Sequence, residues 1–385
     1  MRAPVKVSLA GDYCALPAVE KLLLSGRRDP AWFLREVSGI FRSSDLAIVN
    51  LECPLTESSN PIRKVGPCLK SHAETIRLLT SAGVRLVTTA TNHIRDFGNE
   101  GVLDTLKHCE AHGVRAIGSG ASLEEARHVS YHQIHGQVLA VVNAAESEFA
   151  IATATRAGAN PLDLVYLLSD VREARSRADH VLLIVHGGLE YTHYPSPRSV
   201  AILRFLAEQD VSAVVRHHPH YVQGYEVWKG VPIFYSLGNL FFPWIARSLP
   251  GSYEGIVLTL ELAVDGGCTF AVRGVEQRID AMQVVMMEPA AEEAFLGRLM
   301  DYSKILTDPS ALQRDWSALL QDRMDSYLGP MTLPNYLLER IFRKLGRSAR
   351  IRPNLRKRLL YRNFLQCDAH REAIVDILRS LDDTS

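Results

Sequence analysis

The amino-acid sequence predicts a layered α/β fold followed by a helical C-terminal extension. Short, nearly continuous apolar runs rich in β-branched residues recur along the first 280 residues, which is typical of strands covered on both faces. Segments with helical spacing of apolar residues separate several of these runs, and such alternation indicates a sheet covered by helices. In addition, a small polar cluster follows many of the runs, where a buried strand would reach the edge of its sheet.

The predicted elements can be placed in order along the chain. Strands are expected at residues 5–10, 46–51, 85–90, 138–143, 181–185, 211–215 and 233–235. Helices are expected at residues 31–41, 73–82, 101–112, 161–177 and 197–209. Residues 255–262 and 269–279 are predicted to pair as a hairpin through Asp265-Gly266-Gly267. This hairpin would add two strands to the edge of the sheet.

The composition changes after the hairpin. From Glu288 onward helix formers dominate, with amphipathic spacing over residues 291–307 and 310–327. We therefore expect a catalytic domain at residues 1–280 and a helical, partly basic extension at residues 281–385. Basic residues crowd the interval between Glu339 and Asp368, which contains no acidic residue. That interval is either a solvated helix face or a docking surface for an acidic peptide or another anion.

Charge and hydropathy exclude several classes of protein. Lys+Arg and Asp+Glu both total 43, so a net charge of zero gives no global attraction to nucleic acid or to an anionic membrane. The N-terminal residues lack the charged head and apolar stretch of a secretory signal. No run approaches the roughly 20 apolar residues that cross a bilayer. We predict a cytoplasmic protein without nucleic-acid or membrane partners, and the sequence leaves its oligomeric state open.

The cysteine pattern predicts reduced thiols. The six cysteines are scattered and form no Cys-x-x-Cys pair, unlike a disulfide framework or a zinc site. Cys14 and Cys53 adjoin two of the polar clusters, and we expect both to act as small buried filler.

Six polar clusters hold the candidate functional residues. They read Gly11-Asp12, Asn50-Leu51-Glu52, Asn92 to Asp96, His186 to Tyr191, His217 to His220 and Ser236 to Asn239. Because strand ends meet at one edge of a sheet, these residues are predicted to converge on one crevice. Carboxylates, amide oxygens and imidazoles form a mixed ligand set for a divalent ion, with the carboxylates suited to Ca²⁺ or Mn²⁺ and the histidines to Zn²⁺. The sequence therefore predicts a metal-centred site.

The order of these motifs resembles the CapA family of capsule synthesis proteins, within the calcineurin-like metallophosphoesterase superfamily. The matching stretches are Gly11-Asp12, Asn50 to Thr56, Asn92 to Gly98, His186 to Tyr191, His218 to Gln223 and Tyr235 to Asn239. The resemblance covers roughly residues 5–262 and leaves the C-terminal extension outside it. It implies a calcineurin-like four-layer α/β/β/α sandwich with a metal site at the strand ends.

The resemblance also implies roles for individual residues. The ligand positions of the family fall on Asp12, Glu52, Asn92, His186, His218 and His220. His93 matches the acid/base histidine. The Asp-x-His that begins a typical two-metal phosphatase is here Asp12-Tyr13-Cys14, so one ligand is missing and we expect one ion rather than two. Arg216 stands where the family has a small residue, which places a cation beside the histidine loop and favours an anionic substrate group.

A peptide epimerase is the first function that the resemblance implies. We expect a protein without the membrane anchor of CapA proteins that serve polyglutamate capsule export. A soluble member of the resembled family, the lasso-peptide epimerase, inverts the Cα centre of a peptide's C-terminal residue. Inversion without an organic cofactor needs one base to remove the Cα proton and an acid to return a proton on the opposite face. His93 with Asp96 is the first candidate pair, and Asp12 with His218 or His220 is the second.

Other candidate residues and functions remain open. Lys64, Lys70 and Arg216 could bind a terminal carboxylate of the substrate, although exposed basic residues commonly face solvent. Glu190 and Tyr191 either assist the chemistry or anchor their loop. One alternative function is metal-dependent hydrolysis of an amide, peptide or phosphoester bond. The other is a non-catalytic subunit of a biosynthetic complex, which the basic tail suggests.

Overall fold

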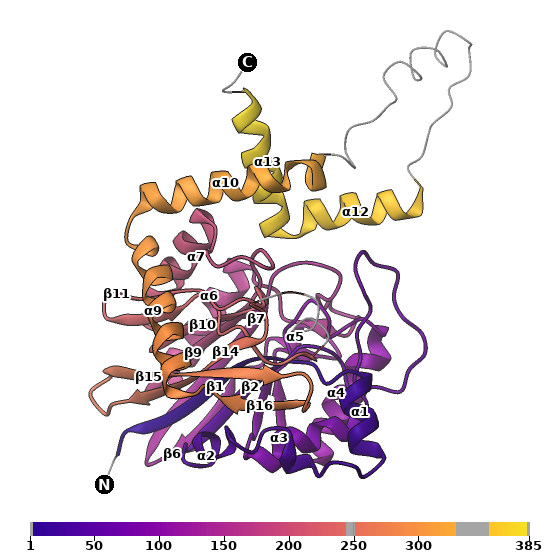
Figure 1. Cartoon of the computed structure of the whole chain (residues 1–385), viewed down its shortest axis with the longest axis vertical. Coiled ribbons are helices and arrows are strands. Elements are labelled where there is room, and N and C mark those ends of the chain that lie inside the picture. Colours follow the sequence, from indigo (N-terminus) through magenta and orange to yellow (C-terminus); the bar gives the residue numbers. More distant parts are fainter. Residues whose placement is uncertain (1–2, 244–248, 250, 329–353, 383–385) are drawn as a thin grey trace.

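Two β-sheets lie face to face at the centre of the structure, a computed structural model that describes residues 3–243, 249, 251–328 and 354–382 (Figure 1). The first sheet has the order β16 (Gln283–Met286), β15 (Cys268–Arg278), β14 (Glu254–Leu262), β1 (Val5–Tyr13), β2 (Leu46–Leu51), β3 (Leu86–Thr88) and β4 (Arg115–Ile117), and β13 (Asn239–Phe241) also pairs with β1. The second has the order β11 (Tyr225–Trp228), β12 (Val231–Phe234), β10 (Ala213–His217), β9 (His180–His186), β7 (Gln137–Ala145) and β6 (Ser130–Ile134). A two-stranded sheet pairs β5 (Ser119–Gly120) with β8 (Gly158–Ala159).

Helices cover the outer face of each sheet. The first sheet packs against α1 (Pro17–Leu24), η1 (Pro30–Trp32), α2 (Ser38–Arg42), η2 (Ala73–Thr75), α3 (Ile76–Ala82) and α4 (Gly98–Ala111). The second packs against α6 (Leu164–Arg177) and α7 (Pro197–Ala207), and the short α5 (Leu123–Ala126) contacts the two-stranded sheet. The order of layers is helix, sheet, sheet, helix. The predicted four-layer α/β/β/α sandwich is confirmed.

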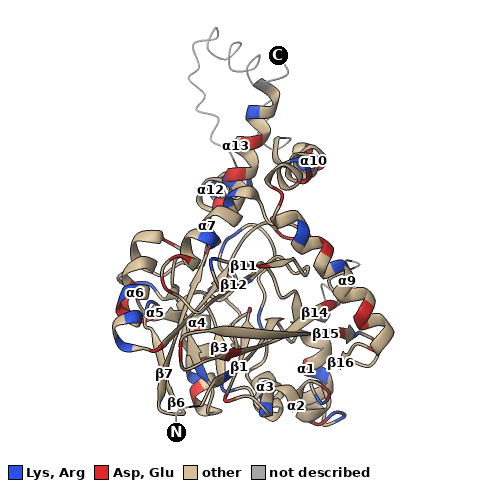
Figure 2. Ribbon diagram, turned by 90° about the vertical axis from the view of Figure 1, so that its left-hand side faces the viewer, with Lys and Arg blue, Asp and Glu red and all other residues tan. Residues whose placement is uncertain are grey.

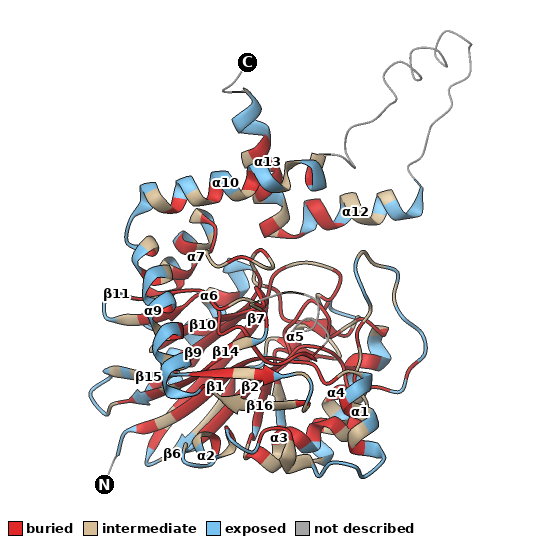
Figure 3. Ribbon diagram, in the orientation of Figure 1, coloured by how far each residue is buried: buried red, intermediate tan, exposed pale blue. Residues whose placement is uncertain are grey.

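Strand β9 illustrates why the sequence is apolar at consecutive positions. Leu182 and Ile184 lie in the core between the two sheets, whereas Leu183 and Val185 lie in the core beneath α6 and α7. All four side chains are fully buried. The continuous apolar runs therefore mark strands with protein on both faces, as predicted, and Figure 3 shows buried residues along the central strands.

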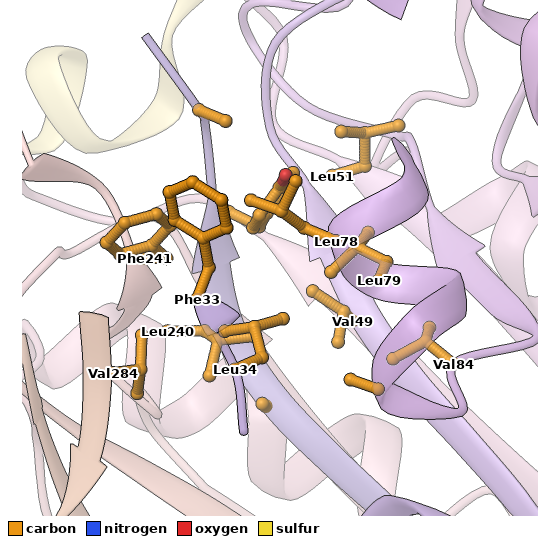
Figure 4. Close-up of a cluster of buried hydrophobic side chains, with 14 of the residues drawn as sticks. Phe33, Leu34, Val49, Leu51, Leu78, Leu79, Val84, Leu240, Phe241 and Val284 are labelled. Atoms are coloured by element: carbon orange, nitrogen blue, oxygen red, sulfur yellow. The ribbon is translucent and has the colours of Figure 1, made fainter. Parts of the chain in front are cut away.

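The predicted helix at residues 31–41 is wrong as a single element. The segment forms only the short turns η1 and α2, and between them Phe33 and Leu34 insert into the core against Phe241 (Figure 4). The Phe33 carbonyl accepts a hydrogen bond from the backbone N–H of Val284, 2.9 Å away, so it is unavailable to a helix ladder. Tertiary packing and pairing with the β16 segment override the local helical pattern here.

Other elements agree with their predictions to within a few residues. Strand β2 has the predicted bounds, and β14 and β15 form the predicted hairpin. The sequence analysis did not identify α1 or the strands β4, β6, β11, β13 and β16. Strand β16 extends the first sheet beyond residue 280, and the division of the chain at that residue stays a prediction.

The first helix of the C-terminal extension packs against β11 and β15 beside the sandwich, and the later helices lie at one end of it (Figure 1). The extension contains α9 (Pro289–Leu306), α10 (Pro309–Leu328), α12 (Leu355–Gln366) and α13 (Asp368–Asp382). Figure 2 shows in a second view that α10, α12 and α13 lie at one end of the sandwich. Of the basic residues between Glu339 and Asp368, Arg356, Lys357, Arg358 and Arg362 lie on α12. Arg340, Arg343, Lys344, Arg347, Arg350 and Arg352 lie outside the described residues. Among the described helices, none combines the length and apolar character needed to cross a bilayer.

One glycine allows β1 to deliver Asp12 to the strand end. The backbone of Gly11 lies against Gly238, and a Cβ atom at position 11 would stand 1.9 Å from the Gly238 carbonyl oxygen. The next residue, Asp12, donates its N–H to that same carbonyl over 3.1 Å. The pairing of β1 with both β2 and β13 shifts register next to this residue. The close approach therefore positions the first candidate ligand.

We expect Gly11→Ala to lower the free energy of unfolding by about 1–3 kcal/mol, because the added methyl group overpacks rigid backbone. Gly297→Ala is the matched control: that site in α9 has open space within 4 Å, and alanine there should stabilise by about 0.5–1 kcal/mol. Urea unfolding monitored by circular dichroism measures both variants. Wild-type stability of Gly11→Ala would contradict the close contact.

Candidate metal centre

The polar clusters converge where the parallel strands of both sheets end. In the first sheet, β1 and β2 end beside one another and bring Asp12 next to Asn50, with Glu52 following. In the second, β9 and β10 pair up to His186 and His217. All five residues are buried. The fold therefore brings the distant clusters together at the strand ends, as predicted.

A first group of candidate ligands comprises Asp12, Glu52 and His220, whose ligand atoms lie within 4.8 Å of one another. The His220 Nδ1 atom is 3.4 Å from Asp12 Oδ2, and its Nε2 atom is 3.5 Å from Glu52 Oε1. Asn50 holds Asp12 in place by donating its side-chain N–H to Oδ1 over 2.7 Å. On the other side, Asn239 Oδ1 lies 3.0 Å from His220 Nδ1.

A second group comprises Glu52, His186 and His218, again within 4.8 Å of one another. The His186 Nε2 atom is 3.2 Å from His218 Nδ1 and 3.1 Å from Asn92 Oδ1. Burial lowers the pKa of His218 to about 4 and lowers the pKa of His186 well below its ordinary value. Both imidazoles are therefore neutral at pH 7, which is the form that binds a metal.

Glu52 belongs to both groups and is the test of whether an ion fits. The residue is fully buried, and neither carboxylate oxygen has a hydrogen-bond partner in the described part of the chain. Burial raises the pKa of this carboxyl well above its ordinary value. A buried carboxylate without hydrogen bonds is costly unless a cation compensates it, so the donor set fits a divalent ion.

The buried carboxylates also change the pKa of the neighbouring His220. Burial lowers the pKa of this imidazole, but the carboxylates of Glu52 and Asp12 outweigh burial and raise the pKa to about 10. His218 and His220 both have positive φ angles, 96° and 58°. Such conformations are uncommon for residues other than glycine and concentrate at functional sites, where the surrounding structure holds them.

His93 and Asp96 form the predicted pair, and Lys64 joins them. The His93 Nδ1 atom is 2.6 Å from Asp96 Oδ2. The Lys64 Nζ atom is 3.1 Å from that same ring nitrogen and pairs with Asp96 Oδ1. Burial and Lys64 lower the pKa of His93. The imidazole is thus held neutral, with Nδ1 directed at a carboxylate and Nε2 left for chemistry.

The remaining predicted substrate residues separate in space. Tyr191 stacks on His220 with ring centroids 5.6 Å apart, and Glu190 Oε1 lies 3.9 Å from His218 Nε2. Lys70, in contrast, donates to the Ser58 carbonyl and lies over the Phe97 ring.

Arg216 lies on the other side of the histidine loop. Its guanidinium donates to the Tyr235 carbonyl and to Gln223 Oε1, and it lines a cavity of about 210 Å³ together with Glu146 and Gly188. Within the described residues, the structure records no polar contact between Lys70 or Arg216 and either ligand group.

Several residues around the site were not selected from the sequence. Asn50, His217 and Asn239 belonged to the polar clusters but were not chosen. Glu148 follows the parallel strand β7, so the strand-end rule could have found it; burial and Glu190 raise its pKa to about 8. His370 on α13, whose charge influences Glu190, had no local signal because the contact depends on how the C-terminal extension folds back.

The expectation of six reduced cysteines is wrong at Cys14 and Cys53. These two residues form a disulfide whose Cα atoms are 5.7 Å apart, while Cys68, Cys109, Cys268 and Cys367 are free. The two half-cystines follow Asp12 and Glu52 closely, and the strand ends that carry these carboxylates are neighbours. Pairing of β1 with β2, which the sequence analysis did not specify, is what brings the cysteines together.

Comparison with known proteins identifies the family. The family model described as "Bacterial capsule synthesis protein PGA_cap" matches residues 6–243. The chain belongs to this family. It is 29% identical over 257 residues to the "Capsule biosynthesis protein CapA" of Bacillus anthracis, which covers 62% of each chain. It is 30% identical over 243 residues to the "PGA biosynthesis protein CapA" of Bacillus subtilis, which covers 62% of this chain and 63% of that relative.

The predicted CapA resemblance is thereby confirmed, although the chain spans less than two thirds of the length of these relatives. Among solved structures, a putative 5'-nucleotidase from Staphylococcus aureus in complex with alpha-ketoglutarate aligns with a TM-score of 0.44 and 12% identity, covering 78% of this chain and 58% of that one. Residues 244–385 lie outside the family match.

We expect wild-type protein to hold one divalent ion tightly, because Asn92 adds a fourth ligand to the second group, whereas Cys14, which stands beside the first group at the position of the missing histidine, is engaged in the disulfide. Glu52→Gln should weaken Mn²⁺ binding by at least about 100-fold, since it removes the carboxylate shared by both groups. Elemental analysis and calorimetric titration measure content and affinity.

The exposed Glu57 provides the control for the Glu52 experiment: Glu57→Gln removes a charge from the same segment and should leave Mn²⁺ affinity unchanged. In EDTA, Glu52→Gln should melt no lower than wild-type protein, because the variant lacks the uncompensated buried charge. Wild-type metal affinity in Glu52→Gln would refute the shared-ligand assignment.

The disulfide predicts a thiol count. Denatured, unreduced protein should react with four equivalents of a thiol reagent per chain, corresponding to the four free cysteines, and with six after reduction. The protein is denatured directly into an excess of the thiol reagent, so that free thiols are trapped before they exchange with the disulfide. Six reactive thiols without a reducing agent would show that Cys14 and Cys53 are not bonded in solution.

Proposed function

We propose that the chain is a metal-dependent enzyme that inverts a Cα centre of a peptide, at the C-terminal residue of a ribosomal peptide, without an organic cofactor. The observation that carries this proposal is the buried cluster of His93, Asp96 and Lys64 beside the two candidate ligand groups. A hydrolase that activates water needs a leaving-group acid, whereas inversion needs a neutral base. The lowered pKa of His93, caused first by burial and then by Lys64, supports the base role.

The steps of the proposed reaction follow from the geometry. His93 Nε2 takes the Cα proton, while Asp96 accepts a hydrogen bond from Nδ1–H and stabilises the imidazolium. A proton returns to the opposite face of Cα from the second pair, Asp12 with His220, because His220 keeps its proton beside the carboxylates whereas His218 is neutral and belongs to the second ligand group. One proton leaves and one arrives, so the substrate changes only its configuration. A divalent ion held by these residues would supply positive charge near the negative charge that develops when the Cα proton leaves.

The substrate class is supported by the family and by the chemistry of the crevice. The two Bacillus relatives are named for capsule and PGA biosynthesis, and we carry over to this chain only a peptide or amino-acid-derived substrate. Of the three basic residues predicted to bind a substrate carboxylate, Lys64 lies beside His93 and Asp96. We therefore propose that Lys64 alone binds the terminal carboxylate of the substrate. We retain the cytoplasm as the proposed compartment, where the Cys14–Cys53 disulfide would be an exception to the usual reduced state of thiols. We propose no membrane or nucleic-acid partner.

Hydrolysis of an amide, peptide or phosphoester bond is the second candidate. It is favoured by the sharing of Glu52 between two ligand groups, because hydrolases with two ions use adjacent sites of this kind. In that reaction His93 would protonate the leaving group. A non-catalytic subunit of a biosynthetic complex is the third possibility that the sequence raised, and the same experiment addresses it.

Incubation of candidate peptides with the Mn²⁺-loaded enzyme in heavy water tests the proposal. We expect uptake of one deuteron at Cα without cleavage, and a rate loss of about 10²–10⁴-fold for His93→Ala, the usual contribution of a general acid/base group. Asp96→Asn should lose about 10–100-fold, because a positioning carboxylate is worth less than the base it orients. Mass spectrometry and chiral analysis measure exchange and configuration.

His108→Ala is the matched histidine control, since His108 lies on α4 and outside the ligand groups; it should exchange at the wild-type rate. Cleavage products that depend on His93 would replace the epimerase by a hydrolase. Neither exchange nor cleavage in any peptide, by a protein that holds its ion, would favour the non-catalytic subunit.

A further inference from the structure

The loop that follows β9 is held from outside by the C-terminal extension. Arg323 on α10 donates from its Nη2 atom to the carbonyl oxygens of Glu190 and Tyr191, over 2.9 and 3.3 Å. Residue 323 is more than 130 positions away in the sequence and beyond the family match, which ends at residue 243. This long-range contact ties the C-terminal extension to the two residues that face the ligand histidines.

An apolar anchor reinforces the contact. Leu189, the residue before Glu190, is buried in a cluster supplied otherwise by α10, α12 and α13. The buried members of this cluster are Leu189, Trp316, Leu320, Tyr327, Phe364, Ala373, Ile374 and Ile377. No other member comes from the sandwich, so burial of Leu189 depends on docking of the extension.

A carboxylate fixes the start of the same loop to α13. Glu146 accepts hydrogen bonds from the backbone N–H groups of Gly188 and Ala369, one on each of its oxygens. The next residue of α13, His370, lies 2.9 Å from the Tyr327 hydroxyl through its Nδ1 atom. The extension is thus linked to the loop at its start through Glu146, at its centre through Leu189 and at its end through Arg323.

The inner side of the loop meets the candidate metal ligands. The Tyr191 ring stacks on His220, and the Tyr191 N–H donates to the Pro219 carbonyl over 2.9 Å. Glu190 lies 3.9 Å from His218. Tyr191 holds a φ of +57°, which costs free energy for a residue with a side chain and persists where the surroundings fix it. Arg323 bonds to the carbonyl of this strained residue.

We propose that the C-terminal helices help to form the metal site. Arg323 acts as a positioning residue that holds Glu190 and Tyr191 beside His218 and His220. This inference rests on the proposed metal-dependent function. The extension orders the outer wall of the crevice, so its docking sets how firmly the site holds an ion and how the peptide substrate is oriented. Without Arg323, the loop would be free to leave its strained conformation.

Substitutions of Arg323 that keep or remove its donors test this proposal. Arg323→Met keeps the apolar stem but loses both hydrogen bonds, whereas Arg323→Lys keeps a donor. In Arg323→Met we expect amide hydrogen exchange of residues 187–191 to rise about tenfold and Mn²⁺ affinity to fall about threefold to tenfold, the range set by one or two lost hydrogen bonds. Arg323→Lys should recover at least half of each effect on a logarithmic scale.

Arg314→Met is the control on the same helix, because Arg314 is exposed; it should behave as wild-type protein in both measurements. Unchanged loop exchange and Mn²⁺ affinity in Arg323→Met would overturn the proposal, as would equal changes in Arg314→Met or no recovery in Arg323→Lys. Both readouts use the protein and Mn²⁺ alone. They therefore stand apart from the peptide assay, and failure of Cα exchange would leave them interpretable.

Discussion

The buried carboxylate of Glu52 is the constraint on which the rest of the site depends. A charge inside the protein without hydrogen bonds destabilises the fold unless a cation lies beside it, and both Glu52 oxygens are in that position. The imidazoles of His186 and His218 are neutral and supply no charge. His220, whose pKa the carboxylates raise to about 10, supplies a positive charge 3.5 Å from Glu52, but only in the protonated form, which does not bind an ion. The arrangement is stable as a whole when an ion occupies it.

The fold creates this constraint by joining two sheets at their strand ends. The first sheet contributes the carboxylates and the amide of Asn50, while the second contributes the histidines. Because the parallel strands of both sheets end on the same side, residues separated by more than 200 positions meet: the His218 backbone N–H donates to Asp12 Oδ2. The extension then closes the outer wall through Arg323, Leu189 and Glu146.

Much of this could be predicted from the sequence. The apolar runs identified the central strands because burial on both faces leaves no polar position in them, and the polar residues after each run identified Asp12, Glu52 and the histidines. The pairing of His93 with Asp96 followed from their spacing, and the structure brings them together. Short or half-exposed strands such as β6 and β11 lacked the periodicity needed to recognise them.

The errors share one cause, which is that the deciding contact is distant in sequence. The segment around Phe33 looked helical, yet a strand some 250 residues later takes its carbonyl. Cys14 and Cys53 looked unrelated until β1 and β2 were known to be neighbours. Lys64 lies beside His93, whereas Lys70 donates a hydrogen bond to the Ser58 carbonyl. Nothing in their local sequence distinguishes the two lysines.

The bond between Cys14 and Cys53 gives the site a property that its ligands alone would not confer. Cys14 and Cys53 follow Asp12 and Glu52 at the neighbouring ends of β1 and β2. Here a covalent link joins the same two strand ends whether or not an ion is present. The bond therefore keeps Asp12 and Glu52 close together independently of any ion, so a bound ion would be needed to compensate charge but not to join these strand ends.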